Sequence, residues 1–340
     1  MTIWVVGQIT VDLIYRGPDT ADSLEPHRGS TQPRIGGKAF NIAAALAKLG
    51  AKVRLVSAVG DDQYARLALS NMKLAGIGTE LVISGSGGRT RPLATPVTKL
   101  TEGIYGERAV LIDLDQNIYQ YYNIALTRAL NSINNNERLP QAIVYTLEFR
   151  GGLLAVLAKL VRQAQQSHKT LVIGNPAPRG TDTPTPDVGE LLRLSDSVIP
   201  NRYEARYLAM DDHSIGNDTV ALAHRIREMY GLSDCICTLG EDGWVWSSAS
   251  AGDGKGQVSR AIVREKVGAS DVFTGTFTLL TLAGAPIDVA TFGAGLAARE
   301  AIQKDGSHER FPTRSELLAV AREEGNPLSA HLVDILERSA

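Results

Sequence analysis

The stretch that decides the fold class runs from Ala142 to Gly174 and reads AIVYTLEFRGGLLAVLAKLVRQAQQSHKTLVIG. Its ends, Ala142–Thr146 and Thr170–Gly174, are short apolar runs typical of buried strands. Between them, Leu153–Gln166 carries apolar residues at the spacing of an amphipathic helix. A strand, a helix and a second strand in this order predict two parallel strands joined by a crossover helix.

The same alternation extends outward in both directions. Further strands are expected at Ile3–Val6, Val53–Val59, Asp196–Ile199 and Cys235–Leu239. Further helices are expected at Ala39–Leu49, Tyr64–Leu74, Val188–Leu194, Asn201–Ala209 and Thr219–Tyr230. The pattern predicts an α/β fold in which helices cover both faces of a mostly parallel central sheet.

Two segments, about 13–35 and 84–125, interrupt the alternation. The first is rich in Pro, Gly, Ser, Asp and Arg, and the second contains β-like pieces at Arg91–Thr95, Ala109–Leu114 and Asn117–Tyr122. Because long irregular segments in a compact protein usually have a function, we expect both to form a small β lid. Ordinary surface excursions are the alternative.

The composition limits the classes of protein to which this chain can belong. The chain has 340 residues, of which 44% are hydrophobic and 21% charged, with a formal net charge of −2. This excludes a fully disordered chain, and no basic excess exists to bind nucleic acid. The length allows two domains or one large domain, and we expect a single domain over 1–340 with the lid segments inserted. With no leader-like start and no apolar run long enough to span a membrane, a cytoplasmic protein is expected.

Familiar nucleotide-binding motifs are missing from the sequence. Gly37-Lys38 is followed by Ala39 and lacks the glycine spacing of a P-loop, and no Gly-x-Gly-x-x-Gly follows the first strand. The six histidines are dispersed, which argues against a zinc hydrolase.

One positive signal is Gly36-Gly37-Lys38-Ala39-Phe40-Asn41-Ile42-Ala43, which leads into a predicted helix. Paired glycines let backbone N–H groups approach a ligand, and the helix adds a fixed dipole. The Asn41 amide can both donate hydrogen bonds to a polyol and accept them. A glycine-rich turn in which Asn41 acts as a cap explains these residues equally well.

A second signal is Val267-Gly268-Ala269-Ser270-Asp271, ahead of apolar helical spacing over Thr274–Leu282. Gly268, Ala269 and Ser270 would present free N–H groups to one point, as an anion hole for a transferring phosphoryl group. The Asp271 carboxylate is placed to take a proton from an attacking hydroxyl. A plain helix N-cap is again the alternative.

Further polar segments follow predicted strands. They are Asp12, Glu148, Asn175-Pro-Ala-Pro178, Asn201-Arg-Tyr-Glu204 and Thr238-Leu-Gly240-Glu-Asp-Gly243. The carboxyl ends of parallel strands form the edge where α/β sheets bind ligands. So many strand-end residues on one edge are hard to explain as packing.

In this order the motifs resemble the PfkB (ribokinase-like) family of carbohydrate and nucleoside kinases over nearly the whole chain. The amino-terminal signature is met at Gly36, Gly37, Asn41, Ala43, Gly50 and Gly60. The family's Asn-x-x-Glu corresponds to Asn201 and Glu204, and its Thr-Leu-Gly-x-x-Gly begins at Thr238. The resemblance implies a ribokinase-like three-layer α/β/α sandwich with a β lid and a homodimer formed through the lid.

The resemblance also implies a role for each site residue. Asp271 would be the general base, beside an anion hole at Gly268, Ala269 and Ser270. The sugar hydroxyls would bind Asp12, Gly36, Gly37, Lys38, Asn41 and Glu148. ATP would bind Asn201, Thr238, Gly240 and Gly243, with Glu204 ordering Mg²⁺ through water, and the helix from Phe292 to Ala301 would contribute to the adenine pocket.

The second family signature is where the sequence departs. Relatives usually have Asp-Thr-x-Gly-Ala-Gly-Asp, and this chain has Glu265-Lys-Val-Gly-Ala-Ser-Asp. Ser270 costs about 1 kcal/mol of strain if its φ is positive, and little if its backbone is helical. Glu265 and Lys266 replace residues whose neighbourhood holds a monovalent cation in many relatives. An ammonium there is able to substitute for K⁺, which argues against activation by K⁺.

The function implied is transfer of the ATP γ-phosphoryl group to a primary hydroxyl of a monosaccharide, as in ribokinases and fructokinases. A nucleoside kinase of the same family is one alternative. A non-catalytic regulator that binds sugar or nucleotide on the same fold is another, suggested by Ser270 and Lys266.

Overall fold

The strands at the centre of the molecule form a nine-stranded sheet in the order β13-β12-β11-β10-β9-β8-β1-β4-β5. The computed structural model describes residues 1–16, 30–85, 93–102, 108–137, 139–177, 183–210 and 218–338, and the following statements concern these residues. The strands of this sheet are β1 (Thr2–Val6), β4 (Lys52–Val59), β5 (Val82–Ser84), β8 (Ala142–Thr146), β9 (Leu171–Asn175), β10 (Ser197–Val198), β11 (Asp234–Thr238), β12 (Trp244–Ser248) and β13 (Gly252–Gly256).

Seven neighbouring strands, from β11 across to β5, pair in parallel. The two antiparallel pairs of this sheet are β11 with β12 and β12 with β13, and they lie at one edge. The expected mostly parallel sheet is therefore confirmed. Its parallel strands all end at the same edge, so the residues that follow them are gathered there.

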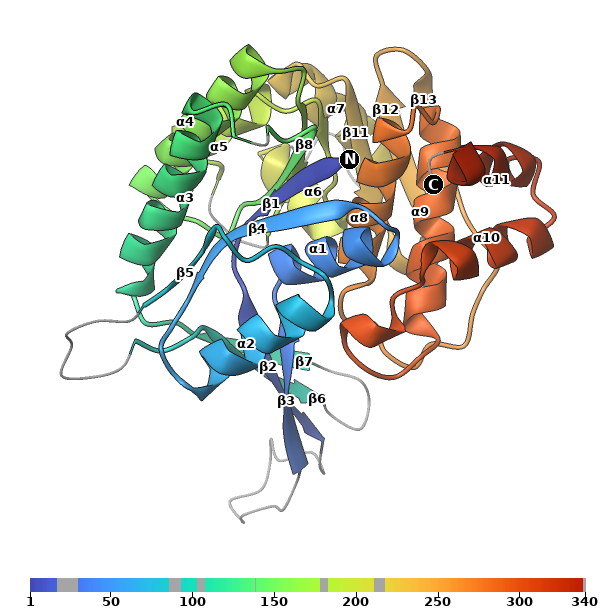
Figure 1. Cartoon of the computed structure of the whole chain (residues 1–340). Coiled ribbons are helices and arrows are strands. Elements are labelled where there is room, and N and C mark those ends of the chain that lie inside the picture. The colour runs from blue at the N-terminus through green and yellow to red at the C-terminus, as the bar shows by residue number, and fades with distance from the viewer. Residues whose placement is uncertain are drawn as a thin grey trace.

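Helices cover both faces of this sheet, which gives three layers (Figure 1). Along β1, Ile3 and Val5 pack into one core while Trp4 and Val6 pack into the other, because successive side chains of a strand point to opposite faces. The first core is covered by α1 (Lys38–Lys48), α2 (Gln63–Leu74), α8 (Ala269–Leu282), α9 (Ile287–Ile302), α10 (Arg314–Glu323) and α11 (Ser329–Arg338). The second is covered by α3 (Ile118–Asn134), α4 (Gly152–Ser167), α5 (Pro186–Arg193), α6 (Arg202–Leu208) and α7 (Thr219–Tyr230).

The small sheet, with the order β3-β2-β6-β7, projects from the lower end of the molecule in Figure 1. Its strands are β2 (Thr10–Arg16), β3 (Ser30–Gly36), β6 (Val97–Glu102) and β7 (Arg108–Asp113). Both segments predicted to form the lid therefore contribute to it. The predicted bounds of the second segment are too wide, because Ser84 belongs to β5 of the large sheet.

The expected strand at Asn117–Tyr122 is wrong, because these residues begin α3. The helix buries Ile118, Tyr122, Ala125, Leu126, Ala129, Leu130 and Ile133, which recur at the three- and four-residue spacing of one helix face. The aromatic and β-branched residues at its start suggested a strand, and this longer apolar period overrides them. Of the expected strand at Arg91–Thr95, residues 93–95 form none, and residues 91–92 lie outside the described part.

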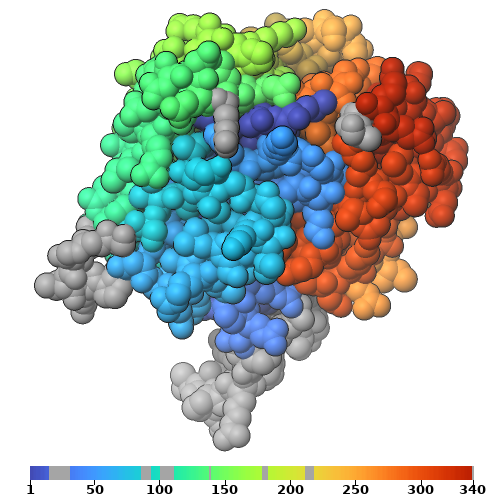
Figure 2. Space-filling model, in the orientation of Figure 1, coloured from blue at the N-terminus to red at the C-terminus, as the bar shows by residue number. Residues whose placement is uncertain are grey.

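The carboxy-terminal helices pack beside the amino-terminal half of the chain. In the space-filling view they adjoin the blue segment (Figure 2). One contact between the two regions is made by Arg314, whose Nε donates to the carbonyl oxygen of Leu49 at 3.1 Å. Within the described residues, no helix is long and apolar enough to cross a membrane.

Candidate active site

Residues at or just after the ends of four parallel strands meet at one edge of the large sheet. Glu148, Asn175, Asn201 and Thr238 stand just after or at the ends of β8, β9, β10 and β11. An isolated parallel bridge joins Asn201 to Thr238, the last residue of β11. The sequence prediction that these four positions share an edge is therefore correct. Asp12, which was expected there as well, instead lies within β2 of the small sheet.

The start of α1 brings Lys38 to the same edge. Gly37 caps the helix with φ of 89°, a left-handed conformation that strains other residues. A Cβ atom there would lie 2.7 Å from the carbonyl oxygen of Gln8, just beyond β1. Only glycine lets the chain turn this close to β1.

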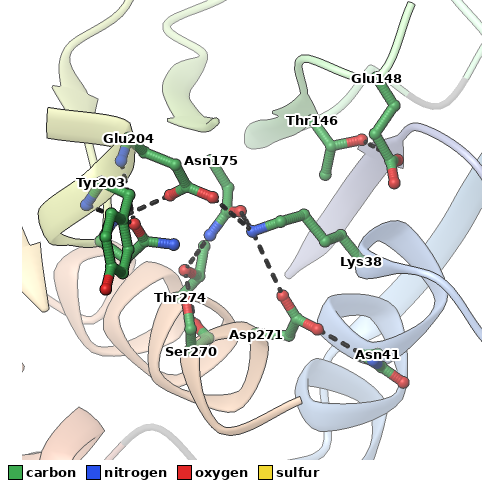
Figure 3. A network of polar contacts seen from close by, with 11 residues as sticks. Lys38, Asn41, Thr146, Glu148, Asn175, Tyr203, Glu204, Ser270, Asp271 and Thr274 are labelled. Carbon is green, nitrogen blue, oxygen red and sulfur yellow. Dashed lines mark hydrogen bonds and ion pairs between the residues drawn. The ribbon is translucent and has the colours of Figure 1, made fainter. Parts of the chain in front are cut away.

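The Lys38 ammonium stands at the centre of a polar network (Figure 3). Its Nζ donates to Oδ1 of Asn175 at 2.8 Å. It lies 3.3 Å from Oε1 of Glu204 and 4.0 Å from Oδ1 of Asp271. Burial opposes the charged form, but the negative charges of Glu204, Asp271 and Glu148 outweigh it and raise the pKa of Lys38.

Asp271 lies in the first turn of α8, with only 5% of the residue exposed. Its Oδ2 accepts a hydrogen bond from Nδ2 of Asn41 at 2.9 Å. Burial raises the pKa of the Asp271 carboxyl, against the opposing effects of Lys38, Asn41 and Arg310. A buried carboxylate at a helix N-terminus, held between an amide and an ammonium, is suited to accept a proton.

The proposed anion hole has a regular backbone. Gly268 caps α8 with φ of 83°, and Ser270 lies within the helix. Ser270 is not among the described non-glycine residues with positive φ, so the serine causes no strain there. The N–H group of Ala269 makes a long hydrogen bond of 3.4 Å to the carbonyl oxygen of Lys266.

On the other side of Asn41 is a hollow between the small sheet and the loop before α8. Its lining comprises Asp12, Ile14, Arg34, Ile35, Asn41, Glu265, Val267, Gly306, Ser307, Arg310 and Phe311. Asn41 therefore connects this hollow to Asp271.

Asp12 and Gly36 shape the wall of the hollow. Oδ1 of Asp12 accepts a hydrogen bond from the Thr10 hydroxyl at 2.9 Å, and burial raises the pKa of Asp12 to about 6. A Cβ atom at Gly36 would lie 2.1 Å from Oδ2 of Asp12. Gly36 thus leaves room for the carboxyl group rather than for a ligand directly.

Glu148 belongs to the edge of this network. Its Oε2 accepts hydrogen bonds from the Gln8 N–H at 3.0 Å and the Thr146 hydroxyl at 2.7 Å. Burial raises the pKa of Glu148, against these bonds and the charge of Lys38. Figure 3 shows Glu148 across from Lys38, with no hydrogen bond or ion pair drawn between them.

Asn201 and Glu204 form a capping box at the start of α6. The Asn201 side chain accepts from the backbone of Tyr203 and Glu204, and Oε2 of Glu204 accepts from the Asn201 N–H at 2.8 Å. This leaves Oε1 of Glu204 directed at Lys38. Burial raises the pKa of Glu204, although Lys38 and the Asn201 N–H act against it.

The remaining predicted nucleotide residues lie beyond β11. Gly240 and Gly243 both have positive φ, 67° and 82°. A Cβ atom at Gly243 would lie 2.2 Å from the carbonyl oxygen of Gly256, so packing against β13 already requires glycine there. On α9, the residues from Phe292 to Ala297 are buried in the core, and only Ala298 to Glu300 are partly exposed before Ala301.

Four contributing residues were not assigned to the site from sequence: Asn175, Thr274, Arg34 and Arg310. Asn175 carried a signal, since it follows a buried strand, and its Nδ2 donates to Oγ1 of Thr274 at 2.6 Å. Thr274 had a weaker one, as it lies one helical turn after Asp271. Arg34 and Arg310 reach the hollow from segments with no motif of their own.

Comparison with solved structures first defines the fold. The structure is similar to ribokinase from Thermotoga maritima, with a TM-score of 0.76 and 21% identity over 94% of this chain and 99% of that one. It is also similar to Arabidopsis thaliana ribokinase complexed with ribose and ATP, with a TM-score of 0.73 and 18% identity over 94% and 97%. The predicted ribokinase-like sandwich is confirmed.

Sequence comparison then defines the family. Residues 2–314 match the pfkB family of carbohydrate kinases. The chain is 26% identical to ribokinase of Haemophilus influenzae over 93% of this chain and 97% of that protein. The chain belongs to the pfkB family of carbohydrate kinases and is a phosphotransferase that acts on a sugar, as the motifs predicted.

Proposed function

We propose that this protein transfers the γ-phosphoryl group of ATP to a primary hydroxyl of a monosaccharide, with Asp271 as the general base. One observation carries the proposal: the Lys38 ammonium lies between the carboxylates of Asp271 and Glu204, at the amino-terminal end of α8. A proton acceptor and a fixed positive charge side by side are what phosphoryl transfer to a hydroxyl requires.

The acceptor sugar would occupy the hollow beside Asn41. Asp12 accepts hydrogen bonds from its hydroxyls, and the Asn41 amide both donates and accepts them. Because Asn41 also contacts Asp271, a hydroxyl bound there is held next to the base. Strands β2 and β3 supply Asp12, Ile14, Arg34 and Ile35 to this hollow, which supports a lid role for the small sheet.

Transfer then proceeds by removal of the hydroxyl proton and stabilisation of the phosphoryl oxygens. Asp271 takes the proton as the sugar oxygen attacks, a contribution of about 10²–10⁴-fold. The Lys38 ammonium and the N–H groups of Gly268 and Ser270 stabilise the negative charge on the transferring group. One such donor is worth roughly 3 kcal/mol in a comparable anion hole.

The nucleotide would lie on the side of Asn201, Thr238 and Gly240. The buried carboxyl groups of Glu204 and Asp271 and the half-buried one of Glu148 all act on the ammonium of Lys38. This surplus of negative charge fits a divalent cation arriving with ATP, and Oε1 of Glu204 is the oxygen placed to order the water of Mg²⁺. Mg²⁺ would neutralise phosphate charge during the transfer.

Ser270 does not favour a non-catalytic regulator. Its helical backbone still supplies the N–H group, and its buried Oγ has no hydrogen-bond partner among the described residues. The base, the ammonium and the acidic partner are all present. We therefore place catalysis ahead of binding alone.

We also propose that the protein forms a homodimer through the small sheet. Strand β7 lies at the edge of that sheet, opposite β3. It exposes Leu111 at 64% and Ile112 at 63%. An edge strand with exposed apolar side chains is a natural site for pairing with a second copy.

The proposal is tested with a panel of monosaccharides and nucleosides in the presence of ATP, Mg²⁺ and K⁺. We expect ADP formation with at least one monosaccharide, at a higher kcat/KM than with any nucleoside. Phosphorus NMR of the product identifies the phosphorylated oxygen. Turnover of nucleosides alone would instead identify a nucleoside kinase, and binding by calorimetry without any turnover a regulator.

A further inference from the structure

Arg310 is buried beside the loop that precedes the anion hole. It ends a short helical turn, His308–Arg310, between α9 and α10, and only 4% of the residue is exposed. Arginine is seldom buried to this extent unless its charge is matched by nearby acceptors. The acceptors of Arg310 are therefore informative.

The guanidinium of Arg310 donates hydrogen bonds to three backbone carbonyl groups. Nη1 donates to the carbonyl oxygen of Glu265 at 3.0 Å and to that of Ala301. Nη2 donates to the carbonyl oxygen of Val267. Two of these carbonyls belong to the loop that ends at Gly268, and the third lies in the last turn of α9, whose dipole is negative there.

The same cluster of oxygens is chemically a cation site. Backbone carbonyl oxygens that converge from two segments are the ligands that take K⁺ in proteins. Here the guanidinium is already hydrogen-bonded to all three, and the guanidinium packs over the Phe311 ring at 5.5 Å. The ammonium of Lys266, which the sequence suggested as a substitute for K⁺, is instead exposed.

A monovalent cation therefore does not fit among these three carbonyl groups while Arg310 is in place. We propose that the Arg310 guanidinium is a built-in cation, which holds the 265–267 loop in position and makes turnover independent of K⁺. Arg310 is a positioning residue, because it acts through the loop and touches no reacting atom. The inference rests on the proposed phosphoryl transfer for its kinetic consequences.

Electrostatics agree with this role. Burial lowers the pKa of Arg310, but an arginine remains charged at neutral pH. Its charge in turn lowers the pKa of the Asp271 carboxyl and so opposes the effect of burial. The guanidinium thus supplies the positive charge that a bound cation would contribute beside the base.

The first experiment measures kcat and KM with KCl, NaCl or tetramethylammonium chloride at constant ionic strength. Wild type is expected to give the same values within about twofold, since its cation is covalently attached. In Arg310→Ala we expect kcat to fall about 10²-fold, because the loop shifts, and to recover when KCl or millimolar guanidinium chloride is added. Arg310→Lys should keep part of the activity without K⁺.

Arg314→Ala is the matched control. Arg314 also donates to backbone carbonyls, those of Leu49 and Leu336, but away from the site. Its removal should lower the melting temperature without creating a response to K⁺. The proposal would be overturned by a wild-type enzyme that needs K⁺. It would also be overturned if neither KCl nor guanidinium chloride restored the activity of Arg310→Ala.

A binding readout separates this inference from the proposed function. KCl should raise the melting temperature of Arg310→Ala relative to tetramethylammonium chloride, and leave that of wild type unchanged. If no sugar is phosphorylated but this difference is found, the built-in cation stands and the proposed reaction fails. If Arg310→Ala does not fold, the same comparison is made with Arg310→Lys, where the absence of a K⁺ effect is expected and a K⁺-induced rise contradicts the proposal.

Discussion

Lys38 shows how one residue sets the charge balance of the site. Its ammonium is the positive partner of Glu204 and lies 4.0 Å from Asp271. Burial raises the pKa of both carboxyl groups, and the charge of the ammonium opposes that rise. Sequence placed Lys38 among the sugar-binding residues, whereas its contacts favour a role toward the phosphoryl group.

This balance predicts a shift in pH dependence for Lys38→Met. Asp271 accepts a proton only above its pKa, so kcat/KM rises with pH through that value. Removing the ammonium raises this pKa further and moves the acidic limb to higher pH, in addition to lowering kcat. Kinetics across pH 4–8 check the shift.

The control is Lys304→Met, which removes an exposed ammonium paired with Glu316 at 2.9 Å. Solvent screens that charge, so its acidic limb should match wild type. If the acidic limb of the pH profile of Lys38→Met lies at unchanged or lower pH, the ammonium does not act on the base.

At the scale of elements, the edge strand β7 makes the proposed homodimer testable. Leu111→Lys combined with Ile112→Lys places two charges on the exposed edge, where they would oppose pairing with a second copy. Wild type is expected to sediment as a dimer and the double variant as a monomer, with unchanged circular dichroism.

The matched control replaces Leu74, which is 81% exposed at the end of α2, with Lys. This variant should remain dimeric. A wild type that sediments as a monomer, or a β7 double variant that stays dimeric, would contradict an interface at the small sheet.

The sequence patterns predicted some helices and strands correctly and others wrongly, for physical reasons. The buried strands and crossover helices carry strong periodicity and lie where expected. The start of α3 was misjudged because Ile118 and Tyr122 suit a strand locally, and only the whole period down to Ile133 identifies the helix. The turn with positive φ at Gly37 could be anticipated from its glycine pair.

At the scale of the whole molecule, topology made much of the site predictable. Because the strands are parallel, Glu148, Asn201 and Thr238 lie on one edge of the sheet, whatever path the connecting segments take. What sequence could not reveal are contacts across the fold, such as that between Arg310 and Glu265, 45 residues apart. No local pattern distinguishes a buried arginine from an exposed one.

The strand ends, α1 and α8 meet around Asp271, which we propose as the general base. Asp271→Asn preserves size and most hydrogen bonds but cannot accept the proton. The variant should keep its melting temperature and its affinity for ATP by calorimetry. The control Asp334→Asn changes an exposed carboxylate on α11 and should keep full activity.

The most direct measurement is the rate of ADP formation by Asp271→Asn with the best sugar of the panel. A loss of about 10²–10⁴-fold in kcat, with folding and ATP binding intact, is the predicted result. Near-normal ADP formation would contradict the assignment of Asp271 as general base.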